Sequence, residues 1–271
     1  MSILPVSLIV LTYNEAKNIA RCLDSVTFAA EKIVVDCGSQ DDTCTIARAH
    51  GARVVEQPWL GFGAQRNFAS TLAAHEWILA LDADEALSPS LATELALGLP
   101  AMLDADTAVG VLRRTAWFMG RPLRWYRPLV GERKARIYHR ARARWSDVRV
   151  HESLVYDGQE RLFRAALLHD LDPTLVHRQL KSLRYAELKA LDWHEHSRKR
   201  SPWAWPFVFS LTFLKDYLLR LAILDGARGW VLAWMAADYA LYKRLRLFEM
   251  QHFAASVDMA RAALRDHDLE R

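Results

Sequence analysis

The stretch Trp77-Ile78-Leu79-Ala80-Leu81-Asp82-Ala83-Asp84 decides the fold of this 271-residue chain. Its first five residues form an unbroken apolar run, which is typical of a strand buried on both faces of a parallel sheet. Two carboxylates, Asp82 and Asp84, follow at the point where the chain leaves the sheet. Hard cations such as Mg²⁺ and Mn²⁺ prefer oxygen ligands that they share with substrate phosphates. The stretch therefore predicts a buried strand that carries an acidic pair to a ligand-binding edge.

The residues before this stretch alternate between short apolar runs and helical patterns. Strands are predicted over 6–11, 33–36 and 53–55, and helices after Asn14, which is a good N-cap, and over 39–51 and 64–74. Strands separated by single helices imply a parallel sheet with right-handed crossovers. The polar clusters 12–15, 36–39 and 82–85 then meet at the edge where such sheets bind ligands. We therefore predict an α/β, Rossmann-like domain with a nucleotide site at this edge.

The pattern changes beyond Thr107. Strands are predicted over 109–112, 135–138 and 162–168, after a helix that starts at Ser88 and continues to Leu97, and the chain is helical from Leu175 onward. These changes predict a catalytic domain over 1–172, with a nucleotide-binding part over 1–115 and an acceptor-side part over 116–172. A helical, aromatic-rich region follows over 173–271.

Two apolar stretches of this helical region, 202–214 and 230–242, are shorter than the ~20 residues of a spanning helix. Basic residues border them and tryptophans lie within them: Lys215, Arg220, Lys243 and Arg244, with Trp203, Trp205, Trp230 and Trp234. This combination favours an interfacial membrane contact. The alternative is a helical bundle that packs on the catalytic domain or on a second copy in a homo-oligomer.

Charge and cysteine content limit the classes of partner and the compartment. The formal net charge is +4, but residues 113–149 are rich in arginine and contain few acids, which indicates a phosphate-bearing partner or, alternatively, a solvated basic face. No helix-turn-helix, zinc or RNA-recognition signature accompanies the basic run, so we expect no nucleic acid partner. The three cysteines lack metal-ligand spacing, and the apolar start of the chain resembles a strand more than a signal peptide. We expect a cytoplasmic location.

Five side chains in the three polar clusters and the third helix have the chemistry of a nucleotide-diphosphate site. Of Asp82 and Asp84, one can bind a metal while the other holds a ribose hydroxyl or a metal-bound water, and the metal neutralises charge on a diphosphate leaving group. Asp36 can accept a hydrogen bond from a base or a ribose; alternatively it belongs with Ser39 to a cluster that caps the next helix. Arg66, near a helix start, can reach a diphosphate.

Taken together, these segments resemble the family 2 glycosyltransferases. The resemblance rests on Leu11–Glu15, Val34–Asp41, Gly61–Asn67 and Leu81–Glu85. The most similar branch is the lipopolysaccharide core β-1,4-glucosyltransferase-like group, which later segments also resemble: Arg133–Tyr138, Val150–Glu152, Leu168–His169, and Leu224–Gly226 with Gly229. Cys37 and the segment 144–149 depart from the pattern of the branch. The segment 144–149 lies in the acceptor region, so it weakens the inference of the acceptor from the resemblance.

The resemblance implies a GT-A fold and an inverting transfer of a sugar, glucose from UDP-glucose, to a glycolipid or saccharide acceptor such as the lipopolysaccharide inner core. It places the chain on the inner face of the cell membrane as a peripheral protein. The nucleotide-sugar site it implies comprises Thr12, Tyr13, Glu15, Asp36, Ser39, Arg66, Asp82, Ala83, Asp84, Arg133 and Arg136. Of these, Arg133 and Arg136 could clamp either the donor diphosphate or a phosphorylated acceptor. Asp82, Asp84 and His169 are the expected ligands of a divalent cation, Mg²⁺ or Mn²⁺.

Inversion by single displacement needs a general base on the acceptor hydroxyl. The resemblance assigns this role to Glu152, with His151 as the competing base or a metal ligand; a surface pair on a strand edge is the alternative interpretation. Two other functions share part of the pattern. A polyprenyl-phosphate sugar transferase has the same opening motifs, and a non-catalytic nucleotide-binding scaffold would not need the intact Asp82 and Asp84.

Overall fold

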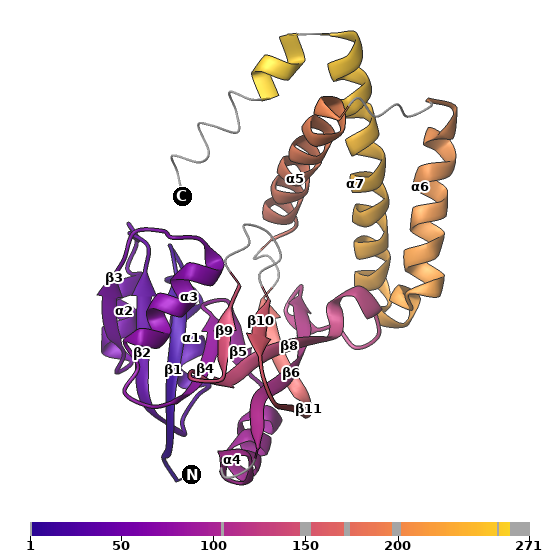
Figure 1. Cartoon of the computed structure of the whole chain (residues 1–271). Helices are drawn as coiled ribbons and strands as arrows, with labels where there is room; N and C mark the ends of the chain where they lie inside the picture. The colour runs from indigo at the N-terminus through magenta and orange to yellow at the C-terminus, as the bar shows by residue number, and fades with distance from the viewer. Residues whose placement is uncertain are drawn as a thin grey trace. The chain divides into compact units, whose positions relative to one another are not determined.

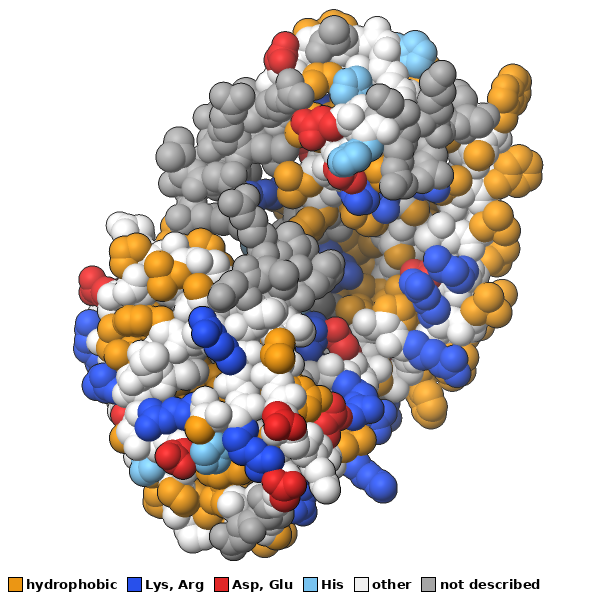
Figure 2. Space-filling model, viewed as in Figure 1, with side chains coloured by type: hydrophobic (Ala, Val, Ile, Leu, Met, Phe, Trp, Pro, Cys, Tyr) orange, Lys and Arg blue, Asp and Glu red, His pale blue; other side chains and the backbone are white. Residues whose placement is uncertain are grey.

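The chain divides into two compact units, shown in the computed structural model of Figure 1. The structure describes residues 2–103, 106–146, 153–170, 174–196, 202–253 and 255–260. Unit 1 comprises Met1–Ala116 and Gly131–Asp170, and unit 2 comprises Trp117–Val130 and Leu171–Arg271. Figure 2 shows Lys and Arg side chains on the visible surface of both. The division falls after Asp170, two residues before the predicted end of the catalytic domain at 172. The segment Trp117–Val130, predicted as acceptor-side, groups with the helical unit.

Unit 1 is built on one curled, mixed sheet. Within the described residues its strand order is β3-β2-β1-β4-β8-β6-β11-β5. Strands β1 (Leu4–Thr12), β2 (Ala29–Asp36), β3 (Arg53–Glu56) and β4 (Trp77–Asp82) are parallel. The remaining strands of this order are β5 (Glu85–Leu87), β6 (Thr107–Phe118), β8 (Val130–His139) and β11 (Gln159–Asp170). β8 runs antiparallel to β4 and β5 antiparallel to β11. The predicted α/β fold with a mostly parallel nucleotide-binding half is confirmed.

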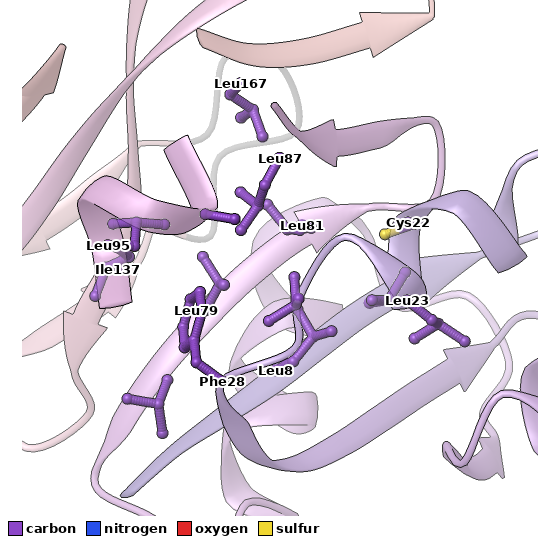
Figure 3. Close-up of a cluster of buried hydrophobic side chains, with 14 of the residues drawn as sticks. Leu8, Cys22, Leu23, Phe28, Leu79, Leu81, Leu87, Leu95, Ile137 and Leu167 are labelled. Carbon is purple, nitrogen blue, oxygen red and sulfur yellow. The ribbon is translucent and has the colours of Figure 1, made fainter. Parts of the chain in front are cut away.

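Helices cover both faces of this sheet. They are α1 (Ile19–Asp24), α2 (Thr43–Ala49), α3 (Phe62–Thr71) and α4 (Pro89–Leu103). Leu8 and Val10 of β1 belong to one buried cluster, whereas Ile9 between them belongs to the other. Figure 3 shows the first cluster, in which Leu8 and Leu79 of adjacent strands meet side chains from the helices. Because successive strand residues point to opposite faces, burial on both faces requires the unbroken apolar runs of β1 and β4.

The first predicted helix begins later than expected. α1 starts at Ile19 with Asn18 at its N-cap position, while Asn14 has a left-handed backbone, with φ of 54°. Asn14 is therefore not the N-cap of α1. Its backbone N–H and its side chain are instead hydrogen-bonded to the loop that contains Ser39 and Gln40. The sequence also gave no sign of the three-residue strands β5, β9 (Ala143–Trp145) and β10 (Leu154–Tyr156), the last two of which form a separate antiparallel pair.

Unit 2 is helical. Its main elements are α5 (Leu175–Glu195), α6 (Trp205–Leu214) and α7 (Ala227–His252), with the π-helical turn η3 (Lys215–Leu219) and the 3-10 turn η4 (Ala222–Asp225) between α6 and α7. The short strand β7 (Arg121–Pro122) pairs with the end of β6. Side chains of α5 and α7, including Trp193 and Leu247, form the buried core of this unit. Among the residues that the structure describes, no helix has the length and apolarity needed to cross a bilayer.

Candidate active site

The three predicted polar loops lie at one edge of the sheet. In the parallel register, Thr12 of β1 pairs with Asp36 of β2, and Leu11 pairs with Asp82 of β4. The three strands therefore end at the same level. Their carboxyl ends form the edge at which open parallel sheets bind ligands.

The first two loops are bound to each other by hydrogen bonds. The backbone N–H of Asn14 donates to Ser39 Oγ over 2.8 Å, and the N–H of Gln40 donates to Asn14 Oδ1 over 2.8 Å. The N–H of Glu15 donates to Thr43 Oγ1 over 2.8 Å. Since each loop satisfies polar groups of the other, the edge is preorganised before any ligand is present.

Asp36 orders the second loop. Its side chain, 1% exposed, accepts hydrogen bonds from the backbone N–H of Gly38 and Ser39 and from Ser39 Oγ, over 2.9, 2.8 and 2.5 Å. Gly38 has φ of +99°, a conformation that side chains rarely adopt. These contacts lie within the loop: α2 starts at Thr43 with Asp42 at its N-cap position, so Asp36 and Ser39 do not cap this helix. The adjacent Thr12 Oγ1 is different: it is buried and has no hydrogen-bond partner among the described residues.

Asp82 is held by two buried arginines. Arg66 Nη2 and Arg136 Nη2 each donate to one of its carboxylate oxygens over 2.6 Å, and these arginines are 3% and 4% exposed. Burial by itself would raise the pKa of Asp82, but the Arg136 and Arg66 guanidiniums outweigh it and hold this pKa well below its usual range. Asp82 is therefore ionised, and both of its oxygens are engaged.

Glu85, to which the sequence reasoning assigned no role, completes this cluster. It is fully buried, accepts a 2.6 Å hydrogen bond from Arg136 and accepts the backbone N–H of Asp82 over 3.2 Å. The guanidinium of Arg66 lies 4.6 Å from the centre of the Trp145 ring. Glu85 belongs to the acidic motif and was recognisable there, whereas nothing in the local sequence marks Trp145, which is brought in by the unpredicted strand β9.

Asp84 meets His169 at the same edge. The Oδ2 of Asp84 and the Nε2 of His169 are 3.0 Å apart, and the side chains are 30% and 19% exposed. The antiparallel pairing of β5 with β11, in which His169 lies opposite Glu85, creates this contact. The N–H of Asp170 also donates to the Asp84 carbonyl over 3.0 Å. Asp84 and His169, distant in sequence, therefore face one another, and their role as metal ligands stays a prediction.

These side chains fit a divalent cation that is shared with a substrate. Within the described ranges, no group of three or more His, Cys, Asp or Glu residues is arranged to hold a metal. Asp84 and His169 supply one oxygen and one nitrogen ligand, while both oxygens of Asp82 are bound by arginines. Mg²⁺ and Mn²⁺ commonly take one or two protein ligands and complete their shell with water and phosphate oxygens. The donor set therefore suits a cation that a diphosphate would complete.

A cationic cavity of about 440 Å³ borders Asp82. Its charged lining consists of Arg66, Arg114, Arg133, Lys134 and Arg136, with Asp82 and Glu160. Arg133 is the most exposed of the salt-bridged cations, at 60% of its side chain, and forms a 2.7 Å salt bridge with Glu160. Because an exposed pair of this kind contributes little to stability, a phosphate can replace Glu160 at low cost.

The two predicted catalytic residues, His151 and Glu152, lie outside the described residues. Ser153, which follows them directly in the sequence, lines the cationic cavity. Of the other predicted residues, Tyr13 and Glu15 lie in the first loop, and Glu15 accepts a 2.8 Å hydrogen bond from Asn18 Nδ2. Ala83 is buried between Asp82 and Asp84.

A parallel sheet whose carboxyl edge carries an Asp-x-Asp pair beside buried arginines defines a GT-A type nucleotide-sugar-binding fold. The family model "Glycosyl transferase family 2" matches residues 7–171, more than half of the chain. The chain belongs to this family and is a glycosyltransferase.

Individual relatives agree with the family. A Rhizobium meliloti protein, "Lipopolysaccharide core biosynthesis glycosyltransferase LpsC", is 29% identical over 91% of this chain and 93% of its own length. An "Uncharacterized glycosyltransferase" of Rickettsia felis is 47% identical over 91 residues, which are 33% of this chain and 32% of that protein. A crystal structure of S. aureus TarS 1–349 in complex with UDP aligns with a TM-score of 0.46 and 16% identity over 93% of this chain and 91% of that chain.

Proposed function

We propose that this protein is an inverting, metal-dependent hexosyltransferase that moves a sugar, glucose from UDP-glucose, to a membrane glycolipid such as the lipopolysaccharide inner core. The observation that carries the proposal is the Asp84–His169 pair, 3.0 Å apart at the carboxyl edge of the sheet, beside an Asp82 whose position is fixed by Arg66 and Arg136.

Each part of the edge has a role in this proposal. The joined loops around Thr12, Tyr13, Glu15, Asp36 and Ser39 receive the nucleotide, and the unpartnered Thr12 hydroxyl is available to it. Asp84 and His169 hold the cation, which stabilises the charge of the departing diphosphate. Asp82, which is ionised and held by Arg66 and Arg136, accepts a hydrogen bond from a hydroxyl of the donor. Preorganised charge of this kind lowers the barrier because no reorganisation is needed during the reaction.

The transfer itself is a single displacement. A base removes the proton of the acceptor hydroxyl while its oxygen attacks C1 of the donor sugar, and the bond from C1 to the diphosphate oxygen breaks on the opposite face. We assign the base to Glu152, with His151 as the competitor. The position of both directly before the cavity-lining Ser153 supports this assignment.

The cationic cavity supports an acceptor that carries phosphate or carboxylate. Arg133, Arg136 and their neighbours match the anionic sugars of a core lipid, and the relative LpsC has a name from that pathway. The same cavity also suits a polyprenyl phosphate, which is the second candidate acceptor. In both cases we propose that the enzyme works on the cytoplasmic face of the membrane.

Thermal-shift measurements with a panel of nucleotides and nucleotide sugars, with and without Mn²⁺, test the donor site. A ligand that binds the folded state raises its Tm by mass action. We expect Mn²⁺-dependent stabilisation by UDP and UDP-glucose that is lost in Asp84→Ala and in His169→Ala.

A matched control is available on the same unit. His50 and Asp24 form another imidazole–carboxylate pair, 2.7 Å apart and more exposed, and Asp24→Ala should keep the full shift. No stabilisation of the wild type by any nucleotide or nucleotide sugar would contradict the proposed donor site, whether the protein is catalytic or not. A comparison of the rate of sugar transfer to core lipid with the rate of transfer to polyprenyl phosphate then decides between the two acceptors.

A further inference from the structure

A row of exposed apolar side chains runs along α6, from the 3-10 turn Pro202–Ala204 before it to η3 after it. Trp203, Phe207, Leu211, Leu214 and Leu218 are 86%, 66%, 64%, 48% and 48% exposed. Their spacings of three and four residues place them on one helix face. Figure 2 shows apolar side chains projecting along the edge of unit 2 where Figure 1 draws α6. We call these five residues the α6 stripe.

The α6 stripe is not used for packing on α7. α6 contacts α7 through other aromatic side chains: Phe209 lies 4.9 Å from Trp234 and Phe213 lies 6.2 Å from Trp230, measured between ring centres. Trp230 and Trp234 stack on each other at 5.3 Å. These aromatic contacts come from side chains outside the stripe, and no residue of α6 is buried.

The segment Trp117–Val130 is hydrogen-bonded to η3 and η4, the two turns that follow α6. The Asp225 carboxylate accepts three consecutive backbone N–H groups, those of residues 124–126, over 2.8, 3.1 and 2.8 Å. Tyr126 Oη donates to Asp216 over 2.8 Å, and the N–H of Arg127 donates to the Arg220 carbonyl over 3.0 Å. These bonds fix the segment rigidly on η3 and η4.

The charges exposed around this junction all have one sign. The acidic residues in the ranges 117–130 and 203–228 are Asp216 and Asp225, which are 1% and 9% exposed and hydrogen-bonded as described. Five of the six basic residues there are exposed, namely Arg121, Arg124, Arg127, Lys215 and Arg220, whereas Arg228 is half-buried and donates to the carbonyls of Phe118 and Arg121. We call these five cations the basic end. An exposed tryptophan, Trp125, lies among them.

We propose that the α6 stripe and the basic end together dock on an anionic lipid bilayer, with α6 lying in the interface. Apolar side chains of such a helix enter the boundary between headgroups and acyl chains, while Lys and Arg contact lipid phosphates and Trp occupies the headgroup level. A second copy fits less well, because an apolar contact between two stripes would leave the basic end without an anionic partner. This inference does not rest on the proposed glycosyl transfer.

Cosedimentation of the full-length chain with vesicles tests the proposal. We expect binding to phosphatidylcholine vesicles that contain phosphatidylglycerol, weaker binding to phosphatidylcholine alone, and weakening by salt. The double variants Phe207→Ser/Leu211→Ser and Arg124→Glu/Arg127→Glu should each lower the vesicle partition coefficient by roughly tenfold or more.

Matched controls come from α5 of the same unit. Val176→Ser/Leu180→Ser replaces side chains that are 69% and 62% exposed, and Lys181→Glu/Lys189→Glu makes the same change of charge. Both controls should bind vesicles as the wild type does, and circular dichroism checks that all variants fold.

Two results would overturn the proposal. One is vesicle binding that does not respond to anionic lipid or to the α6 and basic-end variants. The other is self-association in analytical ultracentrifugation that Phe207→Ser/Leu211→Ser abolishes without changing vesicle binding, since the stripe would then be a subunit interface. Because the assay contains neither donor nor acceptor, failure of glycosyl transfer leaves it unaffected, and failure of docking leaves the donor thermal shift unaffected.

Discussion

At the scale of single residues, the site depends on charges that compensate one another, of which Glu85, Arg66 and Arg136 are buried and Asp82 is partly exposed. Asp82, Glu85, Arg66 and Arg136 are joined by hydrogen bonds of 2.6 Å between each arginine and its carboxylates. Such charges are costly to bury singly and tolerable only as a set, so removing one partner leaves the others uncompensated. The sequence showed the acids and arginines but could not show their pairing, because Arg136 reaches Asp82 from a strand 54 residues further along the chain.

The Asp82 cluster predicts a pH-dependent stability difference. Asp82→Asn should lower the free energy of unfolding by about 2–3 kcal/mol at pH 7, since it weakens two charge-assisted hydrogen bonds. The folded-state pKa of Asp82 is lowered, so its contribution is complete above the ordinary aspartate pKa of about 4 and is lost as the pH falls toward the folded value. The gap between wild type and variant should therefore shrink below about pH 4. Urea unfolding from pH 7 to pH 3 measures it.

The exposed pair Asp24–His50 is the control for that experiment. Asp24→Asn should change stability by less than about 0.5 kcal/mol at pH 7, because an exposed ion pair contributes little. A gap for Asp82→Asn that stays constant down to pH 3 would contradict the assignment of an ionised, arginine-held carboxylate.

Arg133 should act on the acceptor and not on the donor. Arg133→Ala is expected to lower kcat/KM about tenfold for a phosphorylated core acceptor, which corresponds to the loss of one charge-assisted hydrogen bond. The nucleotide thermal shift should stay unchanged. Arg142→Ala removes another salt-bridged arginine, partly exposed and outside this cavity, and serves as the control. An equal loss with a phosphate-free acceptor would show that Arg133 does not recognise phosphate.

At the scale of elements, the strands that could be predicted from the sequence are those with a long apolar run. The long apolar runs of β1, β2 and β4 gave the parallel half of the sheet and the position of its ligand edge, because burial on both faces leaves a clear signal. The three-residue strands β5, β9 and β10 left none. Their pairings place His169 opposite Glu85 and bring Trp145 to Arg66, so the metal pair and the cavity wall depend on tertiary contacts.

The resemblance segment Leu224–Gly226 with Gly229 also acquires a physical role. Asp225 binds the segment 124–126, Gly226 has φ of +63°, and a Cβ on Gly229 would lie 1.7 Å from the Ala222 carbonyl oxygen. These three residues form a structural junction of unit 2. The sequence identified the motif, but its partner lies 99 to 101 residues earlier in the chain and has no signal of its own.

Asp225→Asn should therefore loosen unit 2 without touching the donor site. An amide has one acceptor oxygen for three N–H groups, so we expect a loss of about 2–4 kcal/mol in unfolding free energy and faster amide exchange over residues 117–130. Asp238→Asn on α7, whose carboxylate accepts one hydrogen bond from Gln179, should have a much smaller effect. Similar behaviour of the two variants in hydrogen exchange would show that the junction is not rigid.

At the scale of the whole molecule, each unit has its own buried core, so ligands of one unit should leave the other unchanged. The two clusters on either face of the sheet belong to unit 1, whereas the cluster around Trp193 and Leu247 belongs to unit 2. All described residues that we assign to the donor site, from Thr12 to His169, lie in unit 1. Donor binding therefore draws on contacts within a single cooperative unit.

Hydrogen exchange with and without UDP and Mn²⁺ tests this independence. We expect slower exchange over residues 12–18, 36–43 and 82–87, since binding raises the free energy of local opening by mass action. Exchange in α5 and α7 should change by less than the error of the measurement, and Asp84→Ala should show no protection in any segment. Protection that extends into α5 or α7 would mean that donor binding is coupled to unit 2. In that case the helices would have a part in catalysis beyond the membrane contact that we propose for α6.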